Sequence, residues 1–137
     1  MQVQPYLFFE GRCEEALAFY REALGAEITF LLRFDDAPDR DAHVGLPPGS
    51  GAKVQHASVR IGETTLFASD GRCSGSASFH GVTLSLAVAS EAEAERRFAA
   101  LSAGGQVLMP LASTFFSPRF GMVTDRFGVS WMVLTEA

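Results

Sequence analysis

Residues 15–25 read EALAFYREALG, and this short stretch decides the fold. From Cys13 to Leu24 the apolar side chains recur at intervals of three and four residues, which is typical of one stripe on an α-helix. Gly25 follows the last apolar position, where a glycine commonly ends a helix. The stretch therefore predicts an amphipathic helix over residues 12–24 that covers an apolar layer.

The flanking segments have the composition of β-strands. Residues 3–9 and 27–34 are rich in aromatic and β-branched side chains, which favours strands before and after the helix. Residues 55–61 and 64–69 predict a hairpin that turns at Gly62. Between them, residues 35–51 are rich in Asp, Pro and Gly, so we expect a loop that acts as a mobile flap or a functional lid.

The same order of elements recurs in the second half of the chain. Residues 82–88 predict a strand, and Ser90 with Glu93 forms the capping box of a helix that runs to about residue 103. Strands are then predicted over 106–111, 120–124 and 129–135. Ala94 and Phe98 repeat Ala16 and Tyr20 at an offset of about 78 residues. The sequence therefore predicts an α+β fold built from two βαβββ units.

Composition excludes several classes of function. The chain has 137 residues and a net charge of −5, and Lys53 is its only lysine, so we expect no nucleic-acid partner. No apolar run has the length of a membrane span, and residues 1–5 lack the features of a signal peptide. We therefore expect a cytoplasmic protein with no membrane partner. Its two cysteines, Cys13 and Cys73, are expected to be free thiols.

The first helix and the repeat resemble the vicinal oxygen chelate superfamily, which includes glyoxalase I, bleomycin-resistance proteins and extradiol dioxygenases. Residues 5–11 (PYLFFEG) and 119–131 (RFGMVTDRFGVSW) are similar to one branch, often labelled ubiquinone methyltransferase-like or PhnB-like. No glycine-rich loop that would hold a methyltransferase cofactor follows a predicted strand. The resemblance implies a single glyoxalase-like domain over residues 1–137, with module one about 1–71, module two about 81–137, and paired sheets around a cleft.

The superfamily's enzymes hold a divalent metal in this cleft with His, Glu or Gln side chains from four strands. The spacing from the first helix puts the first of these positions at Pro5, and the strand after Gly62 puts the second at Phe67. The third lies shortly before the second helix, at Thr83, and the fourth lies after Gly128, at Met132. None of the four is an ordinary ligand for such a metal, so we expect no metal and no cofactor there. His43, His56 and His80 leave open a displaced metal site.

Strand alternation then predicts which side chains face the cleft. The positions that share its side include Leu7, Phe9, Ser69, Ser85, Ser130 and Leu134, whereas Tyr6, Phe8, Leu84, Leu86, Trp131 and Val133 would pack under the helices. The predicted ligand-binding residues are therefore Leu7, Phe67, Ser69, Thr83 and Met132 on the floor, and Phe34, His56, Phe116 and Arg119 at the rim. Such an apolar floor with a few hydroxyl groups suits a small apolar or aromatic molecule.

Three hypotheses of function follow. The first is a metal-free small-molecule binding protein that sequesters its ligand as the bleomycin-resistance relatives do, without catalytic residues and as a homodimer. The second is a glyoxalase-like lyase or isomerase with a rebuilt site, in which His56 acts as acid or base or a metal sits elsewhere. The third is a structural or regulatory dimer that binds no ligand.

Overall fold

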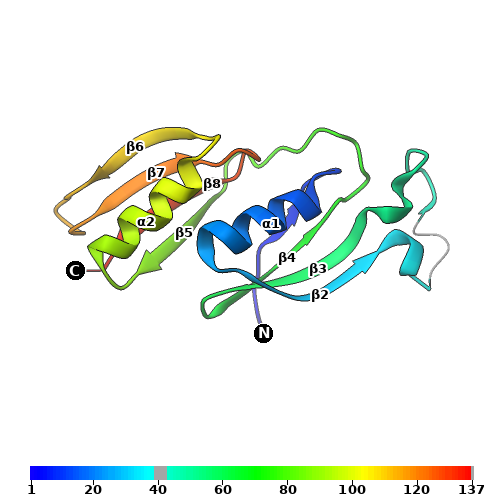
Figure 1. Ribbon diagram of the computed structural model, residues 1–137, viewed down its shortest axis with the longest axis horizontal. Helices are drawn as coiled ribbons and strands as arrows, with labels where there is room; N and C mark the ends of the chain where they lie inside the picture. Colours follow the sequence, from blue (N-terminus) through cyan, green and yellow to red (C-terminus); the bar gives the residue numbers. More distant parts are fainter. Residues whose placement is uncertain (39–42, 137) are drawn as a thin grey trace. The chain divides into compact units, whose positions relative to one another are not determined.

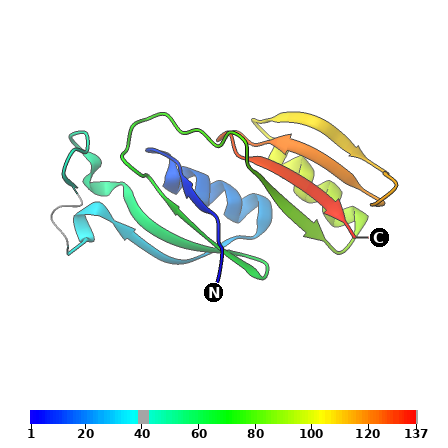
Figure 2. The same cartoon turned by 180° about the vertical axis from the view of Figure 1, so that it is seen from behind.

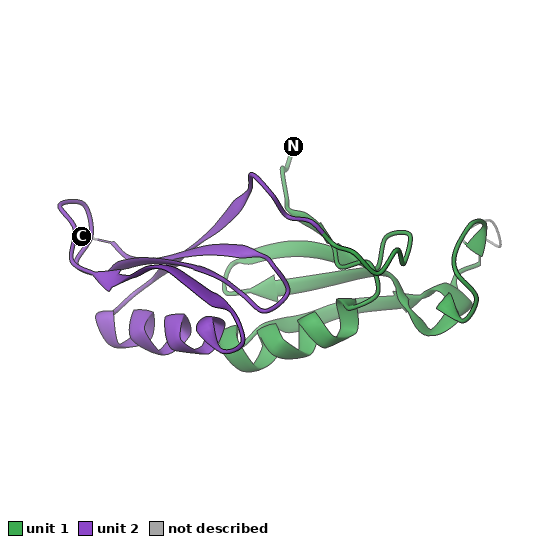
Figure 3. Ribbon diagram, turned by 90° about the horizontal axis from the view of Figure 1, so that it is seen from above, with its two compact units in different colours: residues 1–77 green, residues 78–137 purple. Residues whose placement is uncertain are grey.

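The computed structural model of this chain describes residues 1–38 and 43–136. The chain divides into two compact units, unit 1 over Met1–Ala77 and unit 2 over Ser78–Ala137 (Figure 3). Each unit is described by itself below. No helix in the described residues is both long enough and apolar enough to cross a membrane.

Unit 1 is a four-stranded sheet with one helix on one of its faces (Figure 1). Its elements are β1 (Tyr6–Phe8), α1 (Cys13–Leu24), β2 (Glu27–Arg33), β3 (Val54–Ile61) and β4 (Thr64–Ser69). The strand order is β1-β4-β3-β2, with β1 parallel to β4 and the other pairs antiparallel. Seen from behind, this sheet lies in front of α1, so the helix leaves one face of the sheet uncovered (Figure 2).

Unit 2 repeats this arrangement. Its elements are β5 (Thr83–Val88), α2 (Glu91–Ser102), β6 (Gln106–Ala112), β7 (Phe120–Thr124) and β8 (Ser130–Thr135), and its strand order is β5-β8-β7-β6. Strand β5 is parallel to β8, as β1 is to β4. The predicted α+β architecture of two βαβββ units is confirmed.

The helix ends follow the local signals in the sequence. Gly25 adopts a left-handed conformation with φ of 67°. Its N–H group donates to the carbonyl of Arg21 at 3.0 Å, and the N–H of Ala26 donates to the carbonyl of Tyr20 at 3.3 Å. The Ser90 hydroxyl accepts a hydrogen bond of 3.1 Å from the backbone N–H of Glu93, which caps α2. Both predicted helix boundaries are therefore confirmed to within one residue.

In the described part of the loop predicted between β2 and β3, residues Phe34–Asp36 form the 3₁₀ helix η1 and Ser50–Ala52 form the 3₁₀ helix η3. The Ser50 hydroxyl donates to the carbonyl of Pro47 at 2.7 Å, and the Phe34 N–H donates to the carbonyl of Lys53 at 3.0 Å. The first bond is local, and the second joins the two ends of the loop. Residues 39–42, in the middle of the predicted flap or lid, lie outside the described residues.

A buried carboxylate organises unit 1. Asp70, which directly follows β4, is 1% exposed. Its Oδ1 accepts hydrogen bonds of 2.8 Å from the N–H groups of Gly11 and Cys13, and its Oδ2 accepts one of 2.8 Å from the N–H of Val54. These donors belong to the turn before α1, the first residue of α1 and the first residue of β3. One side chain therefore joins the start of α1, the start of β3, the end of β4 and the turn before α1.

The alternation predicted for the first strand is wrong. Leu7 and Phe9 are 7% and 2% exposed, and the ring of Phe9 lies 6.2 Å from that of Tyr20 on α1, so these side chains lie on the helix-covered face. Tyr6 and Phe8 are 40% and 47% exposed on the opposite face. The prediction failed because it put Pro5 on the same side as Phe67. The parallel register pairs Tyr6 with Phe67 instead. An error of one residue in register moves every side chain of a strand to the opposite face of the sheet. Leu7 is therefore corrected to a core residue.

In unit 2 the predicted alternation is confirmed. Trp131 and Val133 are buried in β8, and Leu84 and Leu86 are half-buried beside them in β5. The alternate positions of β5 and β8, including Thr83 and Met132, lie on the face that α2 leaves uncovered.

We expect Asp70→Asn to lower the free energy of unfolding by about 2 to 3 kcal/mol, because an amide offers one acceptor oxygen and turns its NH₂ group toward backbone donors. Urea unfolding measures this change. Glu63→Gln, a matched substitution in the exposed β3–β4 turn, should stay within about 0.5 kcal/mol of the parent. Equal stability of the two variants would contradict the organising role of Asp70.

Candidate functional site

Aromatic side chains gather on the uncovered face of the unit 1 sheet. Tyr6 pairs with Phe67 across β1 and β4, Phe67 pairs with Ser58 on β3, and Ser58 pairs with Phe30 on β2. His56 lies two residues before Ser58 and shares its side. Residues that are directly paired across strands point to the same face. We call the set Tyr6, Phe8, Phe30, His56 and Phe67 the aromatic face.

The rings of the aromatic face contact one another closely. Tyr6 and Phe8 stack with centroids 4.9 Å apart and an angle of 20° between the ring planes. The His56 imidazole lies 5.4 Å from the ring of Phe67, 5.5 Å from Tyr6 and 6.1 Å from Phe30. Tyr6, Phe8 and Phe30 nevertheless stay 40%, 47% and 45% exposed. A cluster of exposed rings is a feature of binding surfaces.

The polar centre of this face is a hydrogen bond of 2.7 Å between Tyr6 Oη and His56 Nδ1. Partial burial raises the pKa of the Tyr6 phenol above its usual value, and the hydroxyl of Ser69, as a hydrogen-bond partner, lowers it by a smaller amount. Tyr6 is therefore a neutral phenol at physiological pH. It combines a ring for stacking with a hydroxyl that orients His56.

A pocket of about 500 Å³ opens beside Tyr6 and Phe8. It is lined by Tyr6, Phe8, Glu10, Phe34, Gln55, Ser69, Gly71 and Arg72. The volume is that of an ordinary small-molecule site, and the lining combines aromatic rings with a few polar groups. Phe34 and Ser69, both predicted from the sequence, contribute to it together with residues that the prediction missed.

The uncovered face of unit 2 has a different chemistry. Cross-strand pairing aligns Ser85, Met132, Met122 and Met109 in one row over β5, β8, β7 and β6. The next row consists of Thr83, Ser130, Thr124 and Gln106. Predicted residues Thr83 and Met132 thus belong to a face of hydroxyl and thioether groups, within unit 2.

The other predicted rim residues of unit 2 have local partners. Arg119 Nη2 donates to Glu95 Oε1 at 2.7 Å, and Arg119 Nε lies 3.7 Å from Glu91 Oε1, so its guanidinium pairs with α2. Phe116 packs edge-on against Phe115 and Phe120, each at 5.1 Å. The structure therefore brings His56 and Phe67 together on the aromatic face and puts Phe34 and Ser69 in the lining of the adjacent pocket. It gives Arg119 an ion pair with α2.

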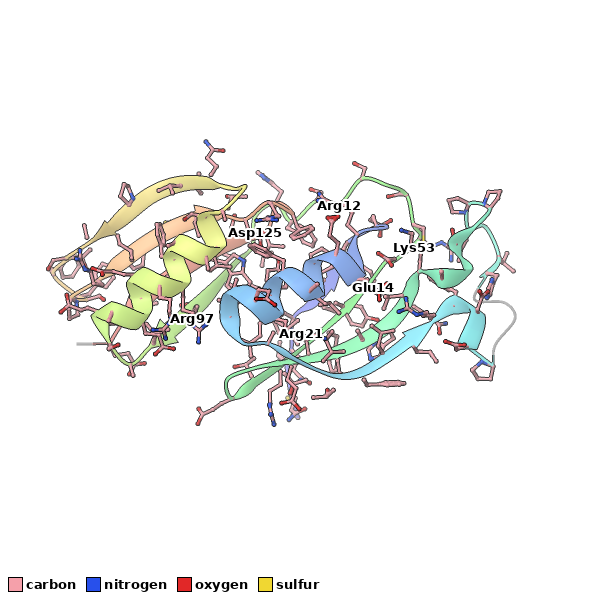
Figure 4. The ribbon with its side chains drawn as sticks, viewed as in Figure 1. Arg12, Glu14, Arg21, Lys53, Arg97 and Asp125 are labelled. Carbon is pink, nitrogen blue, oxygen red and sulfur yellow. The ribbon has the colours of Figure 1, made fainter. Side chains whose placement is uncertain are left out.

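The start of α1 borders a second pocket, which is lined in part by charged residues (Figure 4). Glu14 accepts hydrogen bonds of 2.6 and 3.0 Å from Arg33, and this contact lowers the pKa of the Glu14 carboxyl. Lys53 Nζ donates to the carbonyl of Gly11 at 2.8 Å. Because Asp70 already accepts from the first N–H groups of the helix, the polar groups here are paired within the protein.

The residues at the superfamily's metal positions do not fit a divalent metal. On β1 the observed register puts Tyr6, a neutral phenol, beside Phe67 in place of Pro5. Phe67 has no donor atom in its side chain, Thr83 offers a hydroxyl, and Met132 offers a soft thioether. Over residues 1–38 and 43–136, the side chains of His, Cys, Asp and Glu form no group of three or more that could hold a metal ion. His43 is engaged elsewhere, with Nε2 2.7 Å from the carbonyl oxygen of Phe34.

Sequence reasoning missed Tyr6, Phe8, Phe30 and Gln55. The first two were assigned to the core by the error in register described above. Phe30 lies on β2 between register shifts, so simple alternation from the strand end does not predict its face. The spacing of Tyr6 and Phe8 shows that they share one side of the strand, but the sequence does not show which side α1 covers.

Comparisons with known proteins identify the family and agree with the fold. Residues 1–134 match the model of the family described as 3-demethylubiquinone-9 3-methyltransferase. Protein YjdN of Escherichia coli (strain K12) is 38% identical over 138 residues, which cover 97% of this chain and 94% of that protein. The crystal structure of protein PA1353 from Pseudomonas aeruginosa matches with a TM-score of 0.85 at 43% identity. The match covers 99% of this chain and 98% of the PA1353 chain.

Two further solved structures connect the chain to the wider superfamily. The PhnB protein of Bacillus cereus has a TM-score of 0.77 at 28% identity, with 98% of this chain and 99% of that chain covered. A glyoxalase/bleomycin resistance protein from Albidiferax ferrireducens T118 has a TM-score of 0.56 at 17% identity, with 91% and 90% covered, and shows likeness of fold alone. The resemblance to the vicinal oxygen chelate superfamily and its PhnB-like branch is confirmed.

The two cysteines should differ in reactivity toward a thiol reagent such as Ellman's reagent. Cys13 is 0% exposed, and burial, with a smaller contribution from the Asp70 carboxylate, raises the pKa of its thiol. Cys73 is half-buried, and burial raises its pKa as well. At pH 8 we expect Cys13 to react more than about tenfold more slowly than Cys73, because it must first be exposed by local unfolding.

The variants Cys13→Ser and Cys73→Ser separate the two reactions. Fast labelling that persists in Cys73→Ser would contradict the burial of Cys13.

Proposed function

The chain belongs to the family described as 3-demethylubiquinone-9 3-methyltransferase, and we propose that it is a small-molecule binding protein of the glyoxalase/bleomycin-resistance type. In this proposal it holds an apolar or aromatic ligand against the aromatic face of unit 1, without a metal. The methyl transfer named in the family's description is not part of the proposal, because the chain lacks a glycine-rich cofactor loop after a strand.

The observation that carries the proposal is the exposure of large rings on the uncovered face. Tyr6, Phe8 and Phe30 keep between 40% and 47% of their surface exposed while their edges and faces contact other rings. Apolar surface of this kind is removed from water when a planar molecule stacks on it. The pocket of about 500 Å³ beside Tyr6 and Phe8 offers room for such a molecule.

A second candidate function is a lyase or isomerase that uses His56 as an acid or base. The hydrogen bond between Tyr6 and His56 favours it, because catalytic histidines are commonly oriented by a second polar group. This candidate predicts turnover that is lost in His56→Ala. Binding remains our first choice, since the aromatic face presents one imidazole and, among its five side chains, no carboxylate.

The proposal includes a homodimer in the cytoplasm. The edge strand β6 carries Val107, Leu108 and Met109, which are 44%, 52% and 46% exposed, and such an apolar edge favours pairing with a second copy. The free thiols Cys13 and Cys73 fit a reducing compartment. A dimer that binds no ligand is the remaining alternative, and the first experiment below distinguishes it.

Native mass spectrometry of the purified protein tests the three functions together. We expect the mass of a dimer with an added organic molecule and no metal. A stoichiometric metal ion would contradict the metal-free proposal. A dimer that carries no added mass, and that takes up no aromatic probe in the titration below, would favour the structural role.

A Phe67→Glu variant tests the aromatic face itself. The substitution places a carboxylate among the rings, so we expect affinity for a naphthalene-sized probe to fall by at least about tenfold, measured by ligand-observed NMR titration. Phe115→Ala is the matched control, because Phe115 is 100% exposed in unit 2. Unchanged affinity in Phe67→Glu would contradict the location of the site.

A further inference from the structure

We propose that the ligand of the aromatic face is a planar ring that carries a carbonyl or carboxylate oxygen, and that the Nε2–H group of His56 donates a hydrogen bond to this oxygen. The inference rests on the proposed function and deepens it, since it names the chemical class of the ligand. It follows from the direction of the hydrogen bond between Tyr6 and His56 and from the rings around His56.

The first step is the direction of the bond between Tyr6 and His56. The atoms Tyr6 Oη and His56 Nδ1 are 2.7 Å apart. A neutral phenol is a good donor and a weak acceptor, whereas an unprotonated imidazole nitrogen is a strong acceptor. The favoured arrangement is therefore O–H···N, in which Tyr6 donates and Nδ1 accepts.

The consequence for His56 is a fixed tautomer. When Nδ1 accepts, the single proton of the neutral imidazole sits on Nε2. Within the described residues, Nε2 of His56 has no hydrogen-bond partner, and it is not among their buried side-chain atoms that lack one. It is thus an accessible donor with no protein acceptor to satisfy it.

The neighbours of His56 explain why this donor selects a ligand. The rings of Phe67 and Phe30 lie 5.4 and 6.1 Å from the imidazole, and the ring of Tyr6 lies at 5.5 Å. A planar molecule stacked on these rings would shield Nε2 from water. A ligand without an acceptor would then leave the N–H group unsatisfied, which costs free energy. An acceptor oxygen on the ring removes this cost.

The test uses two probes of nearly identical shape, 2-acetylnaphthalene and 2-isopropenylnaphthalene. They differ in a carbonyl oxygen that the second replaces with a methylene group. We expect the acetyl probe to bind the full-length protein about three- to tenfold more tightly in ligand-observed NMR titrations, which is the range of one hydrogen bond. Equal affinities would overturn the inference and leave the proposed function standing. Failure of both probes to bind would contradict the proposed function itself.

Variants of His56 assign the preference to its Nε2–H group. His56→Phe keeps a ring and removes the donor, so the acetyl probe should lose its advantage while the isopropenyl probe still binds. His56→Gln, whose side-chain NH₂ can take the place of Nε2–H, should retain part of the preference. A preference that persists in His56→Phe would overturn the assignment.

A measurement without ligand tests the tautomer directly. Nitrogen-15 NMR of the imidazole rings, with His43→Gln and His80→Gln used for assignment, should show His56 protonated at Nε2 and unprotonated at Nδ1. Tyr6→Phe should shift the Nδ1 resonance because it removes the donor and keeps the ring. A proton on Nδ1 in the parent protein would overturn the inference.

Discussion

The Asp70 carboxylate is the interaction on which the rest of unit 1 depends. It accepts hydrogen bonds from the backbone of the turn before α1, from the first residue of α1 and from the first residue of β3. A buried carboxylate requires such donors, and the donors, at the ends of their elements, would otherwise lack partners. Asp70 itself directly follows β4, so it fixes β4, β3 and the start of the helix relative to one another. The adjacent β1 continues this network, since Phe9 donates to the carbonyl of Ser69.

This arrangement decides which side chains of β1 are available for binding. The register that pairs Tyr6 with Phe67 puts Leu7 and Phe9 beneath α1 and leaves Tyr6 and Phe8 uncovered. Tyr6 then lies where its hydroxyl meets His56, and its ring lies between Phe8 and Phe67. The register of β1 against β4 therefore determines which aromatic side chains lie on the aromatic face.

Sequence patterns predicted the fold because the signals that determine it are local. The apolar stripe of α1, Gly25 and Ser90 each act within one or two helical turns, and the repeat then implies the sheets. The site was predicted less completely, because it depends on the register between strands that are distant in sequence. Counting back from the helix misplaced β1 by one residue and so exchanged Leu7 for Tyr6. The partners of Arg119 could not be predicted either, since the sequence does not show that Glu91 and Glu95 of α2 lie within reach of its guanidinium.

The two units show why a repeated fold can keep its architecture while its chemistry diverges. Positions under the helices are constrained by packing, and here they keep the same character: Ala16 and Tyr20 in α1 correspond to Ala94 and Phe98 in α2, and all four are buried. The uncovered faces have no such constraint, because substitutions there do not alter the core. The uncovered face of unit 1 carries aromatic rings around His56, and the uncovered face of unit 2 carries thioether and hydroxyl groups. The chemistry that differs between the two units therefore lies on the faces that folding leaves free.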